Sequence, residues 1–332
     1  MLLRTYRSET AAPRGSDTDT HPTMPTYSYA NSLRHAYRVN WRIDDVLGTK
    51  RFDRSKRWLP SSLSGADAVA CLDEDEKRAL TQVELAAYAH LFGYVEEFIA
   101  PKVSALARDF EIDERVAFGA LTNFAAEEVK HMNLFRAVRE RVDDQLGFEL
   151  ARLGDEAKTA RFVLSKSGAA ILLLVASIEW MTQRHYLEAF EEDEALDPLT
   201  KAIFKAHWQE EAQHAQLDHL ETLRAFAPMS AAERERAIDE LIELVAAVHG
   251  LLERQTEHDV ANLSALIGRS FDAAETDEIR GAVLRAKEWT FLTSGVTHPR
   301  FQELFTEVTT APQRERVAAA LQGVLRTELA NA

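Results

Sequence analysis

The sequence predicts an all-α protein whose centre is a four-helix bundle. Long segments rich in Ala, Leu, Glu and Arg dominate the 332 residues, and only 9 prolines and 13 glycines interrupt them. Most of these residues are strong helix formers, and no run of apolar and polar residues alternates as in a strand. A Glu-x-x-His motif also occurs twice, 83 positions apart, within segments of helical periodicity. A hydrophobic content of 46% is sufficient for a sizeable core.

The first 75 residues fall into two parts. Residues 1–25 are rich in Thr, Ser, Asp and Pro, a composition that predicts disorder. Residues 26–75 contain several aromatic and basic residues, including Trp41 and Trp58, and form an N-terminal arm. We expect this arm to pack on the acidic body of the protein. The alternative is that it covers the mouth of the functional site.

Four long helices follow and form the bundle over residues 76–226. Their expected ranges are 76–110, 113–142, 156–192 and 197–226. Pro101 lies inside the first helix, where it cannot donate a backbone hydrogen bond, so we expect a kink there. Asp197 followed by Pro198 marks the start of the fourth helix, because it joins an N-cap residue to a proline at the first helical position.

The C-terminal region, residues 227–332, is predicted to be helical and to complete the same domain. Pro228 ends the bundle, and Ser230 with Glu233 forms a capping box for a fifth helix of about thirty residues or more. Two or three further helices are expected over 273–293 and 299–330. The region carries no functional motif. It either buttresses the bundle or forms an oligomer contact, such as that of a homodimer.

The two Glu-x-x-His motifs are Glu128 with His131 and Glu211 with His214. Residues three apart share a face of a helix, so each motif directs one carboxylate and one imidazole the same way. When the sequence is shifted by 83 positions, the first motif falls on the second. The repeat therefore predicts two similar helix pairs, each of which supplies half of a metal site.

A carboxylate precedes each motif by the same distance. Glu96 lies 32 residues before the Glu of the first motif, and Glu179 lies 32 before that of the second. Two helices that give one Glu each and two that give Glu-x-x-His form the pattern of a bundle that binds two iron or manganese ions. Glu97 is the alternative to Glu96, but only Glu96 lies in an apolar stripe. A carboxylate in such a stripe is costly unless it is paired or metal-bound. The simpler alternative is that these side chains reach solvent at the edge of the stripe.

The ligand types indicate which metals would bind. Oxygen and imidazole ligands suit iron or manganese, whereas the single Cys71 cannot supply the thiolates of structural zinc or an iron–sulfur cluster. The sequence thus predicts two Fe ions, with a mixed Mn/Fe pair as the variant. Metal-bound imidazoles usually donate their other N–H to a carboxylate. We expect Glu127 to accept from His214 and Glu210 to accept from His131; alternatively, both acids face solvent.

Three further residues lie near the predicted ligands. His207 is one helical turn before Glu211 on the same face, where the other half of the repeat has Phe124. It is therefore a candidate for a seventh ligand or for a hydrogen-bond donor to a ligand. Asp218, two turns after Glu211, is a candidate partner for a ligand. Tyr186 is a candidate for a catalytic redox or gating role, although a tyrosine in such a stripe more often belongs to the core.

Together these residues resemble the ferritin-like di-iron oxygenases. The stripe His207-x-x-x-Glu211-x-x-His214 is similar to that of the p-aminobenzoate N-oxygenase (arylamine oxygenase) family, which has a third metal-bound His in that position. The resemblance covers residues 76–226. It implies a ferritin-like bundle, a non-haem di-iron centre and dioxygen activation on an amine or another small organic substrate. It assigns ligand roles by motif to Glu128, His131, Glu179, His207, Glu211 and His214, and by spacing to Glu96.

The leading hypothesis is a di-iron oxygenase or oxidase that uses O2, a small organic substrate and an electron donor. Two alternatives are a ferroxidase or iron-storage protein and a bundle that keeps its metals for structure. A storage bundle needs only four helices, so the arm and the C-terminal helices favour an enclosed substrate site. The net charge of −15 argues against nucleic acid or an anionic membrane as a partner. The single cysteine and the lack of a bilayer-length apolar run predict a cytoplasmic protein.

Overall fold

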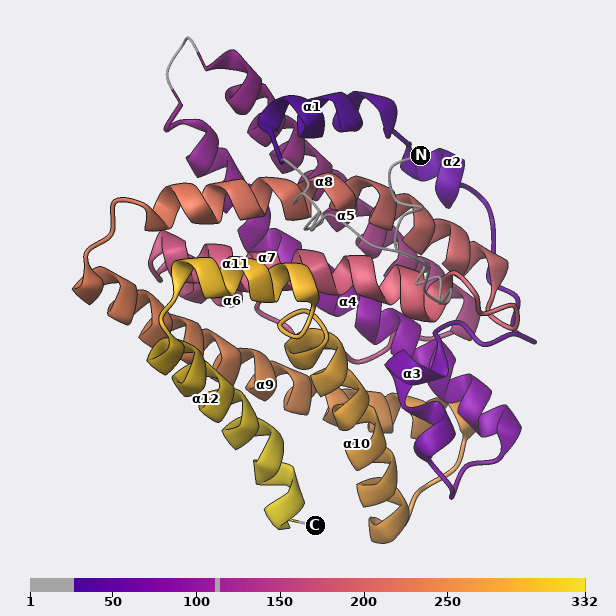
Figure 1. The fold of residues 1–332 in the computed structure, drawn as a ribbon. Helices are drawn as coiled ribbons and strands as arrows, with labels where there is room; N and C mark the ends of the chain where they lie inside the picture. Colours follow the sequence, from indigo (N-terminus) through magenta and orange to yellow (C-terminus); the bar gives the residue numbers. More distant parts are fainter. Residues whose placement is uncertain (1–26, 111–113, 332) are drawn as a thin grey trace, which may run out of the picture.

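The computed structural model describes residues 27–110 and 114–331, with side chains described up to residue 325. Twelve α-helices form within these residues, of which 78% are helical. No strand forms among them, and an isolated parallel bridge joins Arg57 to Leu196. The all-α prediction is thus confirmed (Figure 1). The disorder predicted for residues 1–25 lies outside the described residues.

Four helices make up the central bundle: α4 (Glu74–Ala107), α5 (Arg115–Leu146), α7 (Gly168–His185) and α8 (Pro198–Phe226). Helix α4 pairs along its length with α5, α7 pairs with α8, and α5 also packs on α8. Asp73 caps α4 through a capping box. Asp197 caps α8 with Pro198 in the first turn, as the sequence predicts. Pro101 lies inside α4 without ending it.

One helix that the sequence predicts as single is divided. The range 156–192 contains α6 (Glu156–Leu164), α7 and a π-helical turn, η3 (Tyr186–Phe190). The break comes at Ser167, whose extended backbone and side chain start a new helix at Gly168. The prediction of one continuous helix over 156–192 was therefore wrong. The range 299–330 contains α11 (Pro299–Val308) and α12 (Ala311–Asn331), separated at Thr309, whose φ of −127° and ψ of 158° are not helical.

The N-terminal arm lies across one side of the bundle. It contains α1 (Tyr29–Arg38), α2 (Ile43–Val46), α3 (Ser61–Ser64) and a 3-10 turn, η2 (Ala66–Ala68). Helix α1 packs on α5 and α8, and Figure 1 shows it passing over both. His35 secures it there, because its Nε2 lies 2.7 Å from the carbonyl oxygen of Gln209 on α8. Helix α1 of the arm is therefore attached to α5 and α8.

The C-terminal helices support the opposite side of the bundle. Helix α9 (Ala231–Ile267) begins with the predicted capping box of Ser230 and Glu233 and packs on α4, α7, α10 and α12. Helix α10 (Ala273–Glu288) continues into a second π-helical turn, η4 (Trp289–Thr293), which also contacts α7 and α9. None of the helices in the described ranges is both long enough and apolar enough to cross a membrane.

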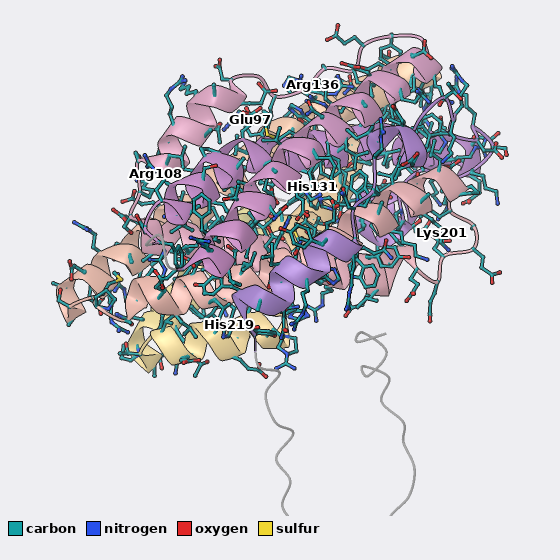
Figure 2. The ribbon with its side chains drawn as sticks, turned by 90° about the horizontal axis from the view of Figure 1, so that it is seen from above. Glu97, Arg108, His131, Arg136, Lys201 and His219 are labelled. Carbon is teal, nitrogen blue, oxygen red and sulfur yellow. The ribbon has the colours of Figure 1, made fainter. Side chains whose placement is uncertain are left out.

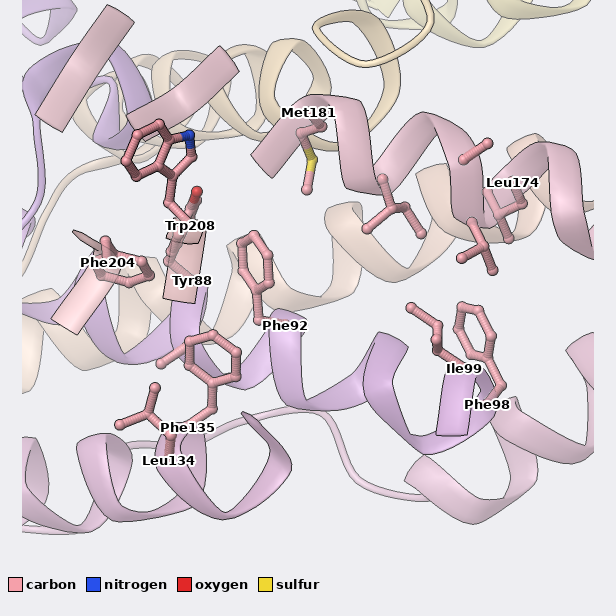
Figure 3. Packing of buried hydrophobic residues seen from close by; sticks show 14 of the residues in the cluster. Tyr88, Phe92, Phe98, Ile99, Leu134, Phe135, Leu174, Met181, Phe204 and Trp208 are labelled. Atoms are coloured by element: carbon pink, nitrogen blue, oxygen red, sulfur yellow. The ribbon is translucent and has the colours of Figure 1, made fainter. Parts of the chain in front are cut away.

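The largest apolar cluster runs from Val46 in the arm to Val308 in α11. Figure 3 shows part of it, where Phe92 of α4, Phe135 of α5 and Phe204 of α8 converge. The rings of Phe92 and Phe135 lie 5.2 Å apart between their centroids. The polar site described next is embedded in this apolar surrounding.

Candidate metal centre

Two groups of carboxylates and imidazoles lie at the centre of the bundle. The first group is Glu96, His131, His207 and Glu211; the second is Glu128, His131, Glu211 and His214. Within each group the candidate ligand atoms lie within 4.8 Å of one another. Each of these side chains is at most 2% exposed. Figure 2 shows His131 in the middle of the helices.

Helix geometry explains how side chains from three helices reach one point. Helix α4 supplies Glu96, α5 supplies the first Glu-x-x-His motif, and α8 supplies the second motif together with His207. The residues of each motif are three apart, and His207 is four before Glu211, so each set lies on one face of its helix. The pairing of α4 with α5 and of α5 with α8 brings these faces together.

Glu211 is the carboxylate that the two groups share through different oxygens. Its Oε1 lies 2.9 Å from Nδ1 of His131 and 2.7 Å from Nε2 of His207. Its Oε2 lies 2.7 Å from Nδ1 of His214. One oxygen thus faces each group, which is the arrangement a carboxylate needs to bridge two ions.

The polar atoms in the centre fit a pair of cations. Both oxygens of Glu128, one oxygen each of Glu96 and Glu179, both nitrogens of His207, and Nδ1 of His131 are buried without a hydrogen-bond partner. Burying such groups is costly unless something binds them. Nδ1 of His214 lies only 2.8 Å from Oε1 of Glu128, although that oxygen accepts no hydrogen bond. An ion that binds its ligands at about 2.1 Å in an octahedron places neighbouring ligand atoms about 3 Å apart.

Two carboxylates fix the outer nitrogens of the imidazoles. Nε2 of His131 lies 2.9 Å from Oε2 of Glu210, and Nε2 of His214 lies 2.8 Å from Oε2 of Glu127. Both hydrogen bonds cross between α5 and α8 and are those that the sequence predicts. A proton on each Nε2 leaves each Nδ1 free to face the centre. The carboxylates are held in turn, Glu210 by Lys130 and Glu127 by Gln213.

The electrostatics follow from burial and close contact. Burial opposes the charged form of His131, but the carboxylate of Glu211 and its neighbours raise the pKa of His131 to about 9. Burial also lowers the pKa of His207. Burial would raise the pKa of Glu211, but the three surrounding imidazoles hold it well below its usual value. The three imidazoles thus favour the ionised form of Glu211.

Two other predicted residues lie near these groups, and a third, Glu97, lies apart from them. Glu179 on α7 belongs to neither group, and burial followed by the charge of Glu211 raises its pKa well above the usual value. Asp218 is 1% exposed, neither of its oxygens accepts a hydrogen bond, and burial raises its pKa well above the usual value. Glu97 is half-buried and belongs to neither group, and Figure 2 shows it near the edge of the molecule, away from His131.

The chain also matches a known family over most of its length. The sequence model described as "P-aminobenzoate N-oxygenase AurF" matches residues 26–275. The chain belongs to the p-aminobenzoate N-oxygenase family. It is therefore an oxidoreductase of the di-iron oxygenase or oxidase class, and iron storage is not favoured. No curated protein matches it.

Solved structures of an R2-like ligand-binding oxidase are similar to this member of the N-oxygenase family. A variant with an anaerobically reconstituted Mn/Fe cofactor is 15% identical, with a TM-score of 0.45, over 86% of this chain and 94% of that chain. Another variant with an aerobically reconstituted Fe/Fe cofactor is 14% identical, with a TM-score of 0.46 and the same two coverages.

In this member of the N-oxygenase family, the N-terminal arm approaches the metal centre more closely than the sequence predicts. The indole of Trp41 stacks on the imidazole of His131, with ring centroids 5.9 Å apart and planes at 13°. Nζ of Lys130 lies 4.3 Å from the centre of the same indole ring. Trp41 was noted only as one of the aromatic residues of the arm. Besides packing on the body, the arm thus covers one side of His131.

An aromatic cavity borders the centre on another side. Its wall consists of Tyr88, Phe92, Thr182, His185, Tyr186, Phe190, Phe204 and His207, and its volume is about 10 Å³. Tyr186 stacks on Trp208, with ring centroids 4.5 Å apart, and burial raises the pKa of its hydroxyl. Figure 3 shows Tyr88 close to Phe204 and Phe92. The sequence does not predict the contact between Tyr88 and His185, because the two residues lie on separate helices.

Proposed function

We propose that seven residues of this chain hold two iron ions and that the centre oxidises a small organic amine with O2. The proposed ligands are Glu96, Glu128, His131, Glu179, His207, Glu211 and His214. The observation that carries the proposal is the pair of buried groups that share Glu211 and contain several polar atoms without partners. Oxygen and nitrogen ligands of this kind suit iron, and a mixed Mn/Fe pair is the variant.

The residues of the chain have separate parts in this function. The chemistry that a reduced metal pair supplies is the activation of dioxygen. Glu210 and Glu127 hold the protons of His131 and His214 away from the centre, which keeps Nδ1 of each imidazole available. Glu179 faces Glu211 and carries a raised pKa, so it can change between a protonated and a ligating carboxylate. The apolar cluster excludes water, which limits side reactions.

For N-oxygenation of an amine, the balanced conversion is R–NH2 + O2 + 2 e− + 2 H+ → R–NHOH + H2O. The nitrogen is oxidised, and an external electron donor supplies the two electrons. The cavity beside His207 is where the amine would approach, with Tyr186 in its wall as a candidate gate. We further propose that the protein works in the cytoplasm, on the support of its single cysteine. A homodimer is the simplest assembly that the C-terminal helices could support.

Metal loading followed by turnover tests this function. The protein is loaded with ferrous iron without oxygen, its metal content is measured, and it is then mixed with O2 and a set of arylamines. We expect two metals per chain, with O2 consumption and an N-oxygenated product detected by mass spectrometry. A reproducible content of one or zero would rule out the paired centre. Growth of a mineral core under excess ferrous iron, without amine oxidation, would favour iron storage instead.

A further inference from the structure

A chain of hydrogen bonds leads away from the aromatic cavity through three buried side chains. The hydroxyl of Tyr88 lies 2.8 Å from Nδ1 of His185, and Nε2 of His185 lies 2.9 Å from Oγ of Ser294. Oγ of Ser294 lies 2.8 Å from the carbonyl oxygen of Thr290. Tyr88 and His185 both line the cavity, so the first of these bonds lies in its wall.

The direction of each hydrogen bond in this chain follows from the bond between Ser294 and Thr290. A carbonyl oxygen only accepts, so Ser294 donates its single proton to Thr290 and must accept from His185. Nε2 of His185 therefore carries the proton, and Nδ1 is an acceptor. The hydroxyl of Tyr88 donates to that Nδ1, which leaves its oxygen able only to accept from anything in the cavity.

The second hydroxyl in the wall is oriented the same way. Oγ1 of Thr182 donates to the carbonyl oxygen of Ile178 at 3.1 Å, so it too can only accept a further hydrogen bond. No Lys, Arg, Asp or Glu is among the lining residues. Burial and then the charge of Arg184 lower the pKa of His185 to about 3, so His185 stays neutral near pH 7. Apart from the proposed ligand His207 and the hydroxyl of Tyr186, the polar groups of the wall are thus acceptors, and none of them is charged.

Ser294 is held firmly in the position that sets this direction. The next residue, Gly295, packs so closely on α7 that a Cβ atom there would lie 1.9 Å from the carbonyl oxygen of Ser177. Arg184 donates from Nη1 to the carbonyl oxygen of Ser294 at 2.7 Å. Trp289, at the start of η4, stacks on His185 with ring centroids 5.3 Å apart. The η4 turn therefore places both the serine and the imidazole.

We propose that the cavity selects an uncharged N–H or O–H donor, such as a neutral aromatic amine, and that Tyr88 accepts its hydrogen bond. Tyr88 is then a specificity-determining residue, and His185 and Ser294 are positioning residues. The inference rests on the proposed function, whose substrate it narrows. A carboxylate or nitro group at the end that reaches Tyr88 would meet acceptors there, and a carboxylate would also be buried without a cation.

The size of the cavity limits what enters without movement. A volume of about 10 Å³ holds one water-sized group. An amino group therefore fits, whereas its ring must displace aromatic side chains of the wall such as Phe190 and Phe204. The polar selection acts on the head group that reaches Tyr88.

The test compares binding of three probes to the iron-loaded protein without oxygen, by calorimetry. The probes are p-toluidine, p-nitrotoluene and p-toluate, which are of similar shape and differ in the group opposite the methyl. We expect p-toluidine to bind roughly tenfold tighter than either of the others, because one hydrogen bond is gained and acceptor contacts are avoided. Equal or tighter binding of p-nitrotoluene or p-toluate would overturn the proposal.

Two variants and a control test whether the hydrogen-bond chain from Tyr88 through His185 to Ser294, here called the relay, sets the preference, or whether packing alone does. Ser294→Ala removes the acceptor for Nε2 of His185, so the proton moves to Nδ1 and Tyr88 turns its own proton into the cavity. The preference for p-toluidine over p-nitrotoluene should then fall about tenfold or reverse, and Tyr88→Phe should bring it close to one. Ser177→Ala alters a buried serine of α7 that donates to Leu174 and should keep the wild-type preference. An unchanged preference in folded Ser294→Ala would overturn the relay.

The result of this binding test can be told apart from the result of the test for the metal centre. Two irons per chain with no donor preference would overturn this inference and leave the centre in place. Donor preference in a chain that fails to hold two irons would support the relay and contradict the centre.

Discussion

Nε2 of His131 on α5 lies 2.9 Å from Oε2 of Glu210 on α8. Glu210 is fully buried and its other oxygen binds Nζ of Lys130, so the carboxylate is held from both sides. A carboxylate accepts only, so His131 donates this bond and keeps its proton on Nε2. This contact therefore decides which nitrogen of His131 faces Glu211, at 2.9 Å.

Replacing the carboxylate by an amide should weaken metal binding without removing a ligand. In Glu210→Gln the amide can present its N–H2 to His131 and favour the wrong tautomer. We expect iron affinity to fall roughly 10- to 100-fold, measured by competition with a chelator under anaerobic conditions. Glu140→Gln on the exposed face of α5 is the matched control and should leave the affinity unchanged. Equal affinities in Glu210→Gln and wild type would show that the hydrogen bond does not support a ligand.

The adjacent residues Glu96 and Glu97 give a second, paired test. Glu96 is 2% exposed and belongs to the first group of candidate ligands, whereas Glu97 is half-buried outside it. Glu96→Gln should therefore lose at least one of the two irons, and Glu97→Gln should retain both. Metal analysis of the two variants prepared side by side gives the answer. Loss of iron in Glu97→Gln alone would mean that α4 is rotated by about 100° relative to the bundle.

Much of this arrangement could be predicted from the sequence because a helix fixes which residues share a face. The spacing of Glu128 and His131 places both on one side of α5, and the same rule applies to α8. The repeat adds the relation between the halves, from which the contacts of Glu127 and Glu210 follow. The capping signals at Asp197 and Ser230 act locally, so the starts of α8 and α9 were predictable too.

Other features depend on long-range packing that no local pattern encodes. The stack of Trp41 on His131 joins residues far apart in the chain. The relay from Tyr88 needs α4, α7 and the η4 turn to meet, and neither π-helical turn has a sequence signal of its own. The break at Ser167 was hidden because apolar residues with helical spacing continue on both sides of it.

A third prediction concerns a buried ion cluster that joins α4 to the C-terminal helices. Nζ of Lys287 on α10 contacts the carboxylates of Glu84 on α4 and, at 2.9 Å, Asp259 on α9. Burial is the main cause that raises the pKa of Glu84 to about 8. Between its ordinary value of 4.5 and about 8, the folded protein keeps a proton that the unfolded chain has lost. The contribution of Glu84 to stability is therefore greatest at low pH and declines across this range.

Glu84→Gln should remove that pH dependence. A single proton gives a slope of at most about 1.4 kcal/mol in the free energy of unfolding per pH unit. The difference in unfolding free energy, wild type minus variant, should thus decrease as the pH rises from 5 to 8. Urea denaturation of both metal-free proteins at several pH values measures it, and titrations elsewhere cancel in the difference. A difference that is constant with pH would contradict the raised pKa.

The last prediction concerns His207, the one imidazole of the centre whose nitrogens both lack a hydrogen-bond partner. Its ring lies edge-on to Phe92 and Phe135, with centroids 5.4 and 4.8 Å away. In the other half of the repeat the same place is taken by Phe124, which stacks on His214 at 3.9 Å. A phenylalanine at 207 therefore suits its surroundings, and His207→Phe should fold.

The variant should still bind iron, because six of the seven proposed ligands remain. It should react differently with O2, since the first group would lose a neutral nitrogen near Oε1 of Glu211, 2.7 Å from Nε2 of His207. Rapid mixing of the reduced proteins with O2, followed by visible absorption, compares wild type and variant. His219→Phe changes another buried histidine of α8 outside both groups and should behave as wild type. If His207→Phe gives the same time course as wild type, His207 is not a ligand, and the four-residue group around Glu96 must bind its iron with three side chains of this chain.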